Sequence, residues 1–303
     1  MLPLFTIIHP LVDACSVSVL VAGGMSWERV VAYNAMAFAL QLPFGVVLDE
    51  WPGFNRCSFF AGTGLTLLSA VAAAFGFGGW SVLVSACIGN ALFHLTAGKH
   101  ILETREGRAG SIGLFISTGA LGLMAGQVWA AKAATLCLSF FAAALGVCVI
   151  LAAILSRRIS SFAVPAPRTT SSPEAFMPML VLAGLFVLIV WRSWAGLFAS
   201  GRSAGDCAAM MLVGAAVTFA GKVAGGYLGE RIGNCKVTAF SVAGSAALAF
   251  LCEPAWVVPW LVLLFVAQLA TGPVLSLVYE KVERRGGRAF GLNCLGLFMG
   301  SLV

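Results

Sequence analysis

The chain has 303 residues, of which 60% are hydrophobic and only 10% are charged, and its net charge is +6. A soluble domain carries about 25% charged residues, and a single core stops growing near about 300 residues, so a soluble fold could not hide this much apolar surface. The cations lie in short loops between apolar runs, a distribution that argues against a nucleic-acid-binding protein and is typical of membrane proteins. We therefore expect an all-α integral membrane protein.

Apolar runs long enough to cross a bilayer, about 20 residues each, recur along the whole chain. A polar stretch interrupts them and contains Pro165, Pro167 and Pro173. It predicts a linker at 156–176 between a six-helix bundle at 1–155 and a second bundle at 177–303. The predicted spans are 2–23, 29–48, 57–76, 79–98, 110–130, 133–155, 177–199, 206–228, 236–252, 255–277 and 289–303.

The positions of the cations predict how the chain is oriented. With the N-terminus inside, thirteen lysines and arginines lie in the cytoplasm and three lie outside. This bias predicts a multi-pass protein of the cell (inner or plasma) membrane with a cytoplasmic N-terminus. The inner set is Arg56, Lys99, Arg105, Arg108, Arg157, Arg158, Arg168, Arg231, Lys236, Lys281, Arg284, Arg285 and Arg288, and the outer set is Arg29, Lys132 and Arg202.

The two halves repeat each other in their charged loops. Residues 103–109 and 283–289 share five of seven letters at an offset of 180, and the loop after the second span matches the one after the eighth at 180 to 181. Parallel six-helix repeats joined by a linker are a transporter architecture. The span at 133–155 finds no counterpart before Val303, so we expect that the last helix is missing, through truncation or loss.

The loop after the eighth span resembles the major facilitator superfamily, whose motif there is G-x-x-x-D-R-x-G-R-R/K. Gly226 to Lys236 fits this motif with Glu230 in place of aspartate. The first copy departs from it, because Glu50 follows Asp49 and Pro52 intrudes, which weakens the expectation of the usual charge latch there. The resemblance implies cytoplasmic gating loops with Asp49, Arg56, Glu230, Arg231 and Lys236.

Four shorter pieces resemble the fosmidomycin-resistance-like branch of that superfamily. They are His9-Pro-Leu-Val-Asp13, Gly89-Asn90-Ala-Leu-Phe93-His94, Gly113-Leu-Phe-Ile-Ser117-Thr118-Gly119-Ala120 and Arg192-Ser193-Trp194. The resemblance implies proton-driven efflux of small anionic or amphipathic compounds, and hence drug resistance.

Charged side chains within apolar runs are costly by at least a few kcal/mol, so each predicts a role. His9 and Asp13 are spaced i, i+4 on one helix face, and we expect them to couple protons, because histidine titrates near neutral pH. Their structural alternative is a hydrogen bond that fixes one helix to another. The residues expected to line a substrate cavity are Asn90, His94, Arg192, Asn34, Gln268 and Asn293, each of which could instead join helices or, for Arg192, reach the interface.

No enzyme motif, nucleotide-binding loop or metal-ligand spacing is present, and nine cysteines lie mostly in apolar runs without a C-x-x-C pair. We expect no enzyme activity, cofactor or metal, and partners limited to a small-molecule substrate, protons and the lipid bilayer around a monomer. The leading hypothesis is a proton-coupled exporter. Uptake by symport, or a non-transporting membrane enzyme or receptor with this fold, are the alternatives.

The orientation is testable at the linker. In a cysteine-free variant, a Ser171→Cys substitution should not react with a membrane-impermeant thiol reagent added to intact cells, because the linker is expected inside. The same cysteine should react after permeabilisation. Ready labelling from outside would contradict the predicted topology.

Overall fold

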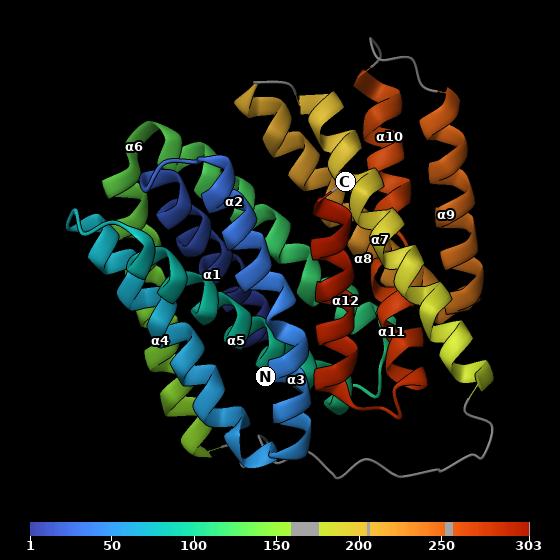
Figure 1. Cartoon of the computed structure of the whole chain (residues 1–303), viewed down its shortest axis with the longest axis horizontal. Coiled ribbons are helices and arrows are strands. Elements are labelled where there is room, and N and C mark those ends of the chain that lie inside the picture. The colour runs from blue at the N-terminus through green and yellow to red at the C-terminus, as the bar shows by residue number, and fades with distance from the viewer. Residues whose placement is uncertain (159–175, 205–206, 252–256, 303) are drawn as a thin grey trace.

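The computed structural model describes residues 1–158, 176–204, 207–251 and 257–302, which are helical without a β-strand (Figure 1). The first half contains α1 (Leu2–Ala22), α2 (Trp27–Asn34), a π-helical turn η1 (Ala35–Ala39), α3 (Gln41–Glu50), a 3-10 turn η2 (Pro52–Phe54), α4 (Asn55–Ala74), α5 (Trp80–Thr104) and α6 (Ala109–Arg158). The second half contains α7 (Phe176–Ala204), α8 (Ala208–Ile232), α9 (Asn234–Leu251), α10 (Val257–Gln268), α11 (Thr271–Lys281) and α12 (Gly286–Ser301).

The described residues include nine helical stretches long and apolar enough to cross a membrane. One of them, Ala109–Leu155, has 47 residues and is broken at Ala133, so it makes two passes. The eleventh predicted span corresponds to α12, which has 16 residues. The all-α membrane fold expected from composition is confirmed. Of the predicted linker at 156–176, residues 159–175 lie outside the described residues, and the domain boundaries stay a prediction.

Two spans are interrupted where the hydropathy pattern predicts continuous helices. The second span contains the π-helical turn that ends at Ala39, and the tenth is broken at Leu269 and Ala270. In each case a proline follows four residues later, Pro43 or Pro273. A proline ring clashes with the carbonyl four residues before it and lacks an N–H, so the helix is disturbed there and restarts with the proline in its first turn.

The halves meet through glycine contacts between the second span of one and the fifth span of the other. In the first contact α3 packs on α12, and the two helices lie side by side in Figure 1. In the second, α6 packs on α8. A Cβ atom on Gly45 would overlap the carbonyl of Gly287, and one on Gly226 would lie 2.5 Å from the carbonyl oxygen of Ala109. This reciprocal exchange supports the parallel repeat, and small residues allow the close approach.

The loop after the fourth span of each half has a different register from the one that the matching letters indicate. Thr104 and Lys281 end the preceding helices, Ala109 and Gly286 begin the following ones, and both pairs are 177 positions apart. Residues with positive φ agree with this offset, since Glu106 and Gly107 (51° and 71°) correspond to Glu283 and Arg284 (56° and 58°). The letter match at 180 is therefore displaced by three residues from the structural correspondence.

The contact between α3 and α12 predicts an opposite outcome for two glycine substitutions. Gly45→Ala should lower the apparent melting temperature in detergent, because overpacking costs about 1–3 kcal/mol, more than the roughly 0.5–1 kcal/mol that alanine gains in a helix. Gly64→Ala in α4 is the matched control, because its Cβ would meet nothing within 4 Å. It should be neutral or stabilising. Equal melting of both variants would contradict the close contact.

Candidate functional site

A buried carboxylate in the first half lies between two histidines. His9 and Asp13 come from α1, one turn apart, and His94 comes from α5. His9 Nε2 is 3.2 Å from Asp13 Oδ2, and His94 Nε2 is 3.2 Å from Asp13 Oδ1. The three side chains are only 4%, 8% and 9% exposed. We call these three residues the acidic centre; the structure brings together the sequence-predicted proton pair and His94.

Hydrogen bonds to the backbone fix which nitrogen of each histidine faces Asp13. His9 Nδ1 lies 2.7 Å from the carbonyl oxygen of Phe115, and His94 Nδ1 lies 2.8 Å from that of Asn90. A carbonyl only accepts, so each Nδ1 carries a hydrogen and donates it. In a neutral imidazole the facing Nε2 is then a lone-pair acceptor, directed at a carboxylate that also only accepts. The acidic centre therefore requires a positive charge between these atoms.

Further polar groups position the carboxylate and leave one face of it open to close approach. Asn90 Nδ2 donates to Asp13 Oδ1 at 3.0 Å and to Ser16 Oγ at 3.2 Å. From α6, Gly119 faces the acidic centre: a Cβ there would lie 2.6 Å from His9 Nε2 and would overlap Asp13 Oδ2. The absence of a side chain at this position lets α6 approach His9 Nε2 and the carboxylate closely.

A second buried charge, Arg192 of α7, lies against the break in the tenth span. Its Nη1 donates to Gln268 Oε1 at 3.3 Å and to Thr271 Oγ1 at 3.0 Å, on the two sides of the break. Arg192 is 4% exposed, and its Nε and Nη2 atoms have no hydrogen-bond partner within the described part of the chain. The guanidinium therefore keeps two donors for an anionic acceptor. We call Arg192, Gln268 and Thr271 the basic centre.

The two centres occupy corresponding places in the two halves. The acidic centre joins the first and fourth spans, and the basic centre joins the seventh and tenth. The contacts of Asp13 are to the two histidines and Asn90, whereas those of Arg192 are to Gln268 and Thr271. Lys222 of α8 is half-buried and interacts electrostatically with both Asp13 and Arg192. Its charge therefore links the acidic centre to the basic centre.

Asp49 makes a latch between the halves, although its loop departs from the superfamily motif. Its carboxylate accepts from the backbone N–H groups of Gly287 (2.9 Å) and Arg288 (2.8 Å), in the first turn of α12. Lys99 Nζ donates to Asp49 Oδ1 at 2.9 Å and also contacts Glu103. A carboxylate is favoured at a helix N-terminus, where free N–H groups and the helix dipole meet it. The first loop therefore joins the two halves despite its departure from the motif.

Glu230 repeats this arrangement on the other contact between the halves. Its Oε1 accepts from the backbone N–H of Gly110 at 2.8 Å, in the first turn of α6. Arg56, Arg231 and Lys236, predicted for the same gating loops, are exposed instead. Sequence reasoning missed Lys99 and Glu103, whose i, i+4 spacing at the end of a span was the available signal.

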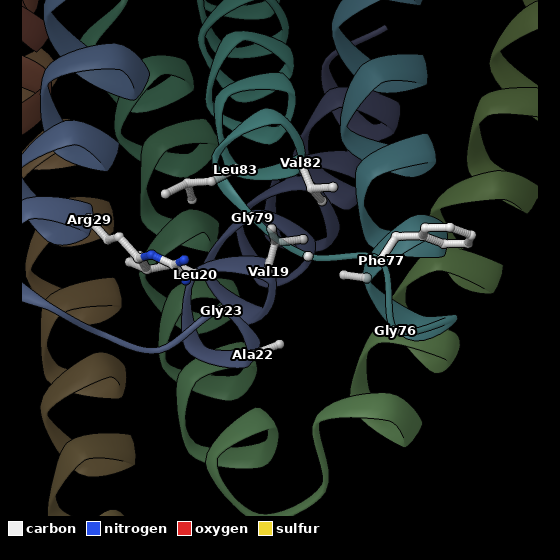
Figure 2. A pocket seen from close by; sticks show the side chains of 12 residues that line it. Val19, Leu20, Ala22, Gly23, Arg29, Gly76, Phe77, Gly79, Val82 and Leu83 are labelled. Carbon is white, nitrogen blue, oxygen red and sulfur yellow. The ribbon is translucent and has the colours of Figure 1, made fainter.

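Two other residues that we predicted to line the cavity, Asn34 and Asn293, belong to neither the acidic nor the basic centre. Asn34 is half-buried where α2 meets the π-helical turn, and Asn293 is buried on α12 beside Cys294. A cavity of about 110 Å³ lies elsewhere, between the end of α1 and the start of α5. Val19, Phe77 and Leu83 are among its lining residues (Figure 2). Drug-sized ligands occupy about 300–1,000 Å³, so this cavity is too small for one.

Comparison with known proteins finds no family model and no curated protein that matches the chain. Solved structures do match. They include the fucose:proton symporter FucP of E. coli in its outward conformation, with 13% identity, a TM-score of 0.65 and coverage of 99% of this chain and 89% of that one. A bacterial homologue of the iron transporter ferroportin matches with 14% identity, a TM-score of 0.58 and coverage of 99% and 89%.

The nucleoside transporter NupG is similar too, with 13% identity, a TM-score of 0.54 and coverage of 100% of this chain and 90% of that one. FucP is described as a major facilitator superfamily transporter. The chain has the major facilitator fold. At this identity the likeness concerns the fold, and the narrower fosmidomycin-resistance-like branch stays a prediction.

The latch predicts that two neighbouring carboxylates differ in their effect on stability. Asp49→Asn should lower the apparent melting temperature strongly, because breaking a buried pair costs about 3–5 kcal/mol. Glu50→Gln should change it little, since Glu50 pairs with Arg285 and Arg288 at the surface, and surface pairs contribute about 0–1 kcal/mol. Thermal unfolding in detergent compares them. A Glu50→Gln effect as large as that of Asp49→Asn would contradict the assigned latch.

Proposed function

We propose that this protein is a secondary active transporter that couples protons at the acidic centre to the movement of a small organic anion held at the basic centre. The observation that carries the proposal is the acidic centre itself. Each of its three side chains can accept a proton on an atom that faces the others, and neither histidine can turn its Nε2 away without losing a backbone hydrogen bond. A buried site that binds and releases protons is what proton coupling requires.

The basic centre supports an anionic substrate. Arg192 keeps two donors without partners in the described residues, and an arginine fork suits a carboxylate or phosphate. The charge lies beside a broken helix, and discontinuous helices commonly form the substrate sites of transporters near the bilayer midplane. Gln268, predicted as a cavity residue, then orients the guanidinium through its side-chain oxygen.

Coupling between the two centres follows from electrostatics. A bound anion would offset the positive charge of Arg192 and of Lys222, which interacts electrostatically with both Arg192 and Asp13, and the charge of Lys222 disfavours protons at Asp13. When this repulsion is offset, the proton affinity of the acidic centre rises. By thermodynamic linkage, protonation of the acidic centre then raises the affinity of the basic centre for the anion by the same factor. Because the anion and the proton favour each other, this arrangement favours the symport alternative over the efflux that the branch resemblance implies.

Alternating access would operate through the two contacts between the halves. The latch at Asp49 and its counterpart at Glu230 hold one end of the bundle closed. Opening that end requires α3 to separate from α12 and α6 from α8. A membrane enzyme or receptor with this fold, the remaining alternative, would have no need for opposite charges in corresponding places of the two halves.

The test begins with a strain that expresses the protein, whose growth on a panel of organic anions and toxic compounds identifies a substrate. Proteoliposomes with an internal pH indicator then measure proton movement when that compound is added. Asp13→Asn should abolish uphill transport and the linked proton flux while leaving substrate exchange partly intact, because the amide cannot take the proton. Glu28→Gln, at an exposed acid of α2, is the matched control and should behave as the unmodified protein. Full pH-driven transport by Asp13→Asn would refute the proposal.

A further inference from the structure

The acidic centre has the donor set and the spacing of a metal site. The ligand atoms of His9, Asp13 and His94 all lie within 4.8 Å of one another, and all three residues are buried. Metal–nitrogen and metal–oxygen bonds of about 2.0–2.2 Å place neighbouring ligands of one ion roughly 3 Å apart. The two Nε2-to-oxygen distances of 3.2 Å agree with that spacing. Among the described residues this is the cluster that could hold a metal ion.

The hydrogen bonds around the acidic centre also favour metal binding, in addition to the short distances between its ligand atoms. Histidines that bind metals usually donate their other N–H to a carbonyl or carboxylate, which fixes the ring and the ligating nitrogen. Both histidines do so here, through the carbonyls of Phe115 and Asn90. The lone pairs of the two Nε2 atoms thus face the two oxygens of one carboxylate, and Gly119 of α6 lies close against them.

We infer that the His9–Asp13–His94 centre binds a divalent first-row transition-metal ion in competition with protons. Two imidazoles and one carboxylate suit Zn²⁺, Fe²⁺, Co²⁺ or Mn²⁺, whereas Mg²⁺ and Ca²⁺ prefer oxygen ligands. This inference concerns the same atoms as the proposed function, since up to two protons on the Nε2 atoms would leave as one ion binds. The neighbouring titratable groups are Tyr33, Lys222 and Cys294, whose interactions with Asp13 are electrostatic.

The chain provides matched variants for a test. His9→Ala and His94→Ala each remove one ligand, and Gly119→Ala keeps all ligands but fills the adjacent space. His100→Ala is the control, because His100 is the chain's third histidine and packs edge-on against Phe5, outside the centre. The exposed Cys57, Cys207 and Cys235 are replaced by serine in every protein, so that thiols do not bind the probe.

The experiment adds Co²⁺ to purified full-length protein without an affinity tag, in detergent, and records the visible ligand-field spectrum, the bound metal and the protons released. We expect one ion per chain, up to two protons released per ion, and no displacement by Mg²⁺. Either histidine variant should weaken binding by more than the roughly 10–100-fold typical of losing an outer-shell partner, and Gly119→Ala should also weaken it. His100→Ala should bind as the unmodified protein does.

Several results would overturn the inference. These are no Co²⁺ bound by folded unmodified protein at millimolar concentration, unchanged binding in both histidine variants, or equal loss in His100→Ala. If a histidine variant fails to fold, as judged by gel filtration, Gly119→Ala and the proton count decide. If the protein binds no metal but still transports its substrate in response to a pH gradient, only this inference is refuted. Metal binding without a response of transport to a pH gradient would refute only the proposed function.

Discussion

Inside a bilayer a charged side chain has no water around it, so every buried charge must be met by another group of the protein. The three polar clusters of this chain are three solutions to that constraint. Asp13 is met by two imidazoles and an amide, Asp49 by a lysine and the first turn of α12, and Arg192 in part by Gln268 and Thr271. Among the described residues, Arg192 is met incompletely, and its Nε and Nη2 atoms remain as donors for a ligand.

These clusters are arranged by the repeat. The second span of each half carries a carboxylate that caps the fifth span of the other half, Asp49 on α12 and Glu230 on α6. The first and fourth spans of each half carry a buried charge, but its sign differs between Asp13 and Arg192. The repeated contacts thus join the halves at two places, while the buried charge is a carboxylate in one half and a guanidinium in the other.

Sequence reasoning found the helices because hydropathy acts over about 20 residues and the bilayer imposes that length. It paired His9 with Asp13 because i, i+4 residues share a helix face. The contact of His94 with Asp13 depends on how α1 packs on α5, which no local spacing encodes. The proline-induced interruptions near Ala39 and Leu269 were missed because hydropathy is insensitive to backbone hydrogen bonds.

The loop register shows the same limit from another side. The letters of 103–109 and 283–289 agree best at an offset of 180, while the helix ends and positive φ values correspond at 177. Because arginine and glycine recur in both loops, identical residues can align at an offset that differs from the structural one. The structural correspondence is set by where each helix ends. The role of Asp49 at the contact between the halves was hard to predict for a related reason. Its partners are Lys99 and backbone N–H groups of α12, and a sequence motif does not specify backbone partners.

The fixed tautomers of the acidic centre have an electrical consequence. Without bound cations the centre carries one negative charge, and with a proton on each Nε2, or with one divalent ion, it carries one positive charge. A conformational change that moves this centre relative to the two membrane surfaces therefore moves charge of opposite sign in the empty and the loaded centre. One elementary charge crossing 100 mV corresponds to about 2.3 kcal/mol. The membrane potential would then bias which form of the centre faces each side, independently of any difference in proton concentration.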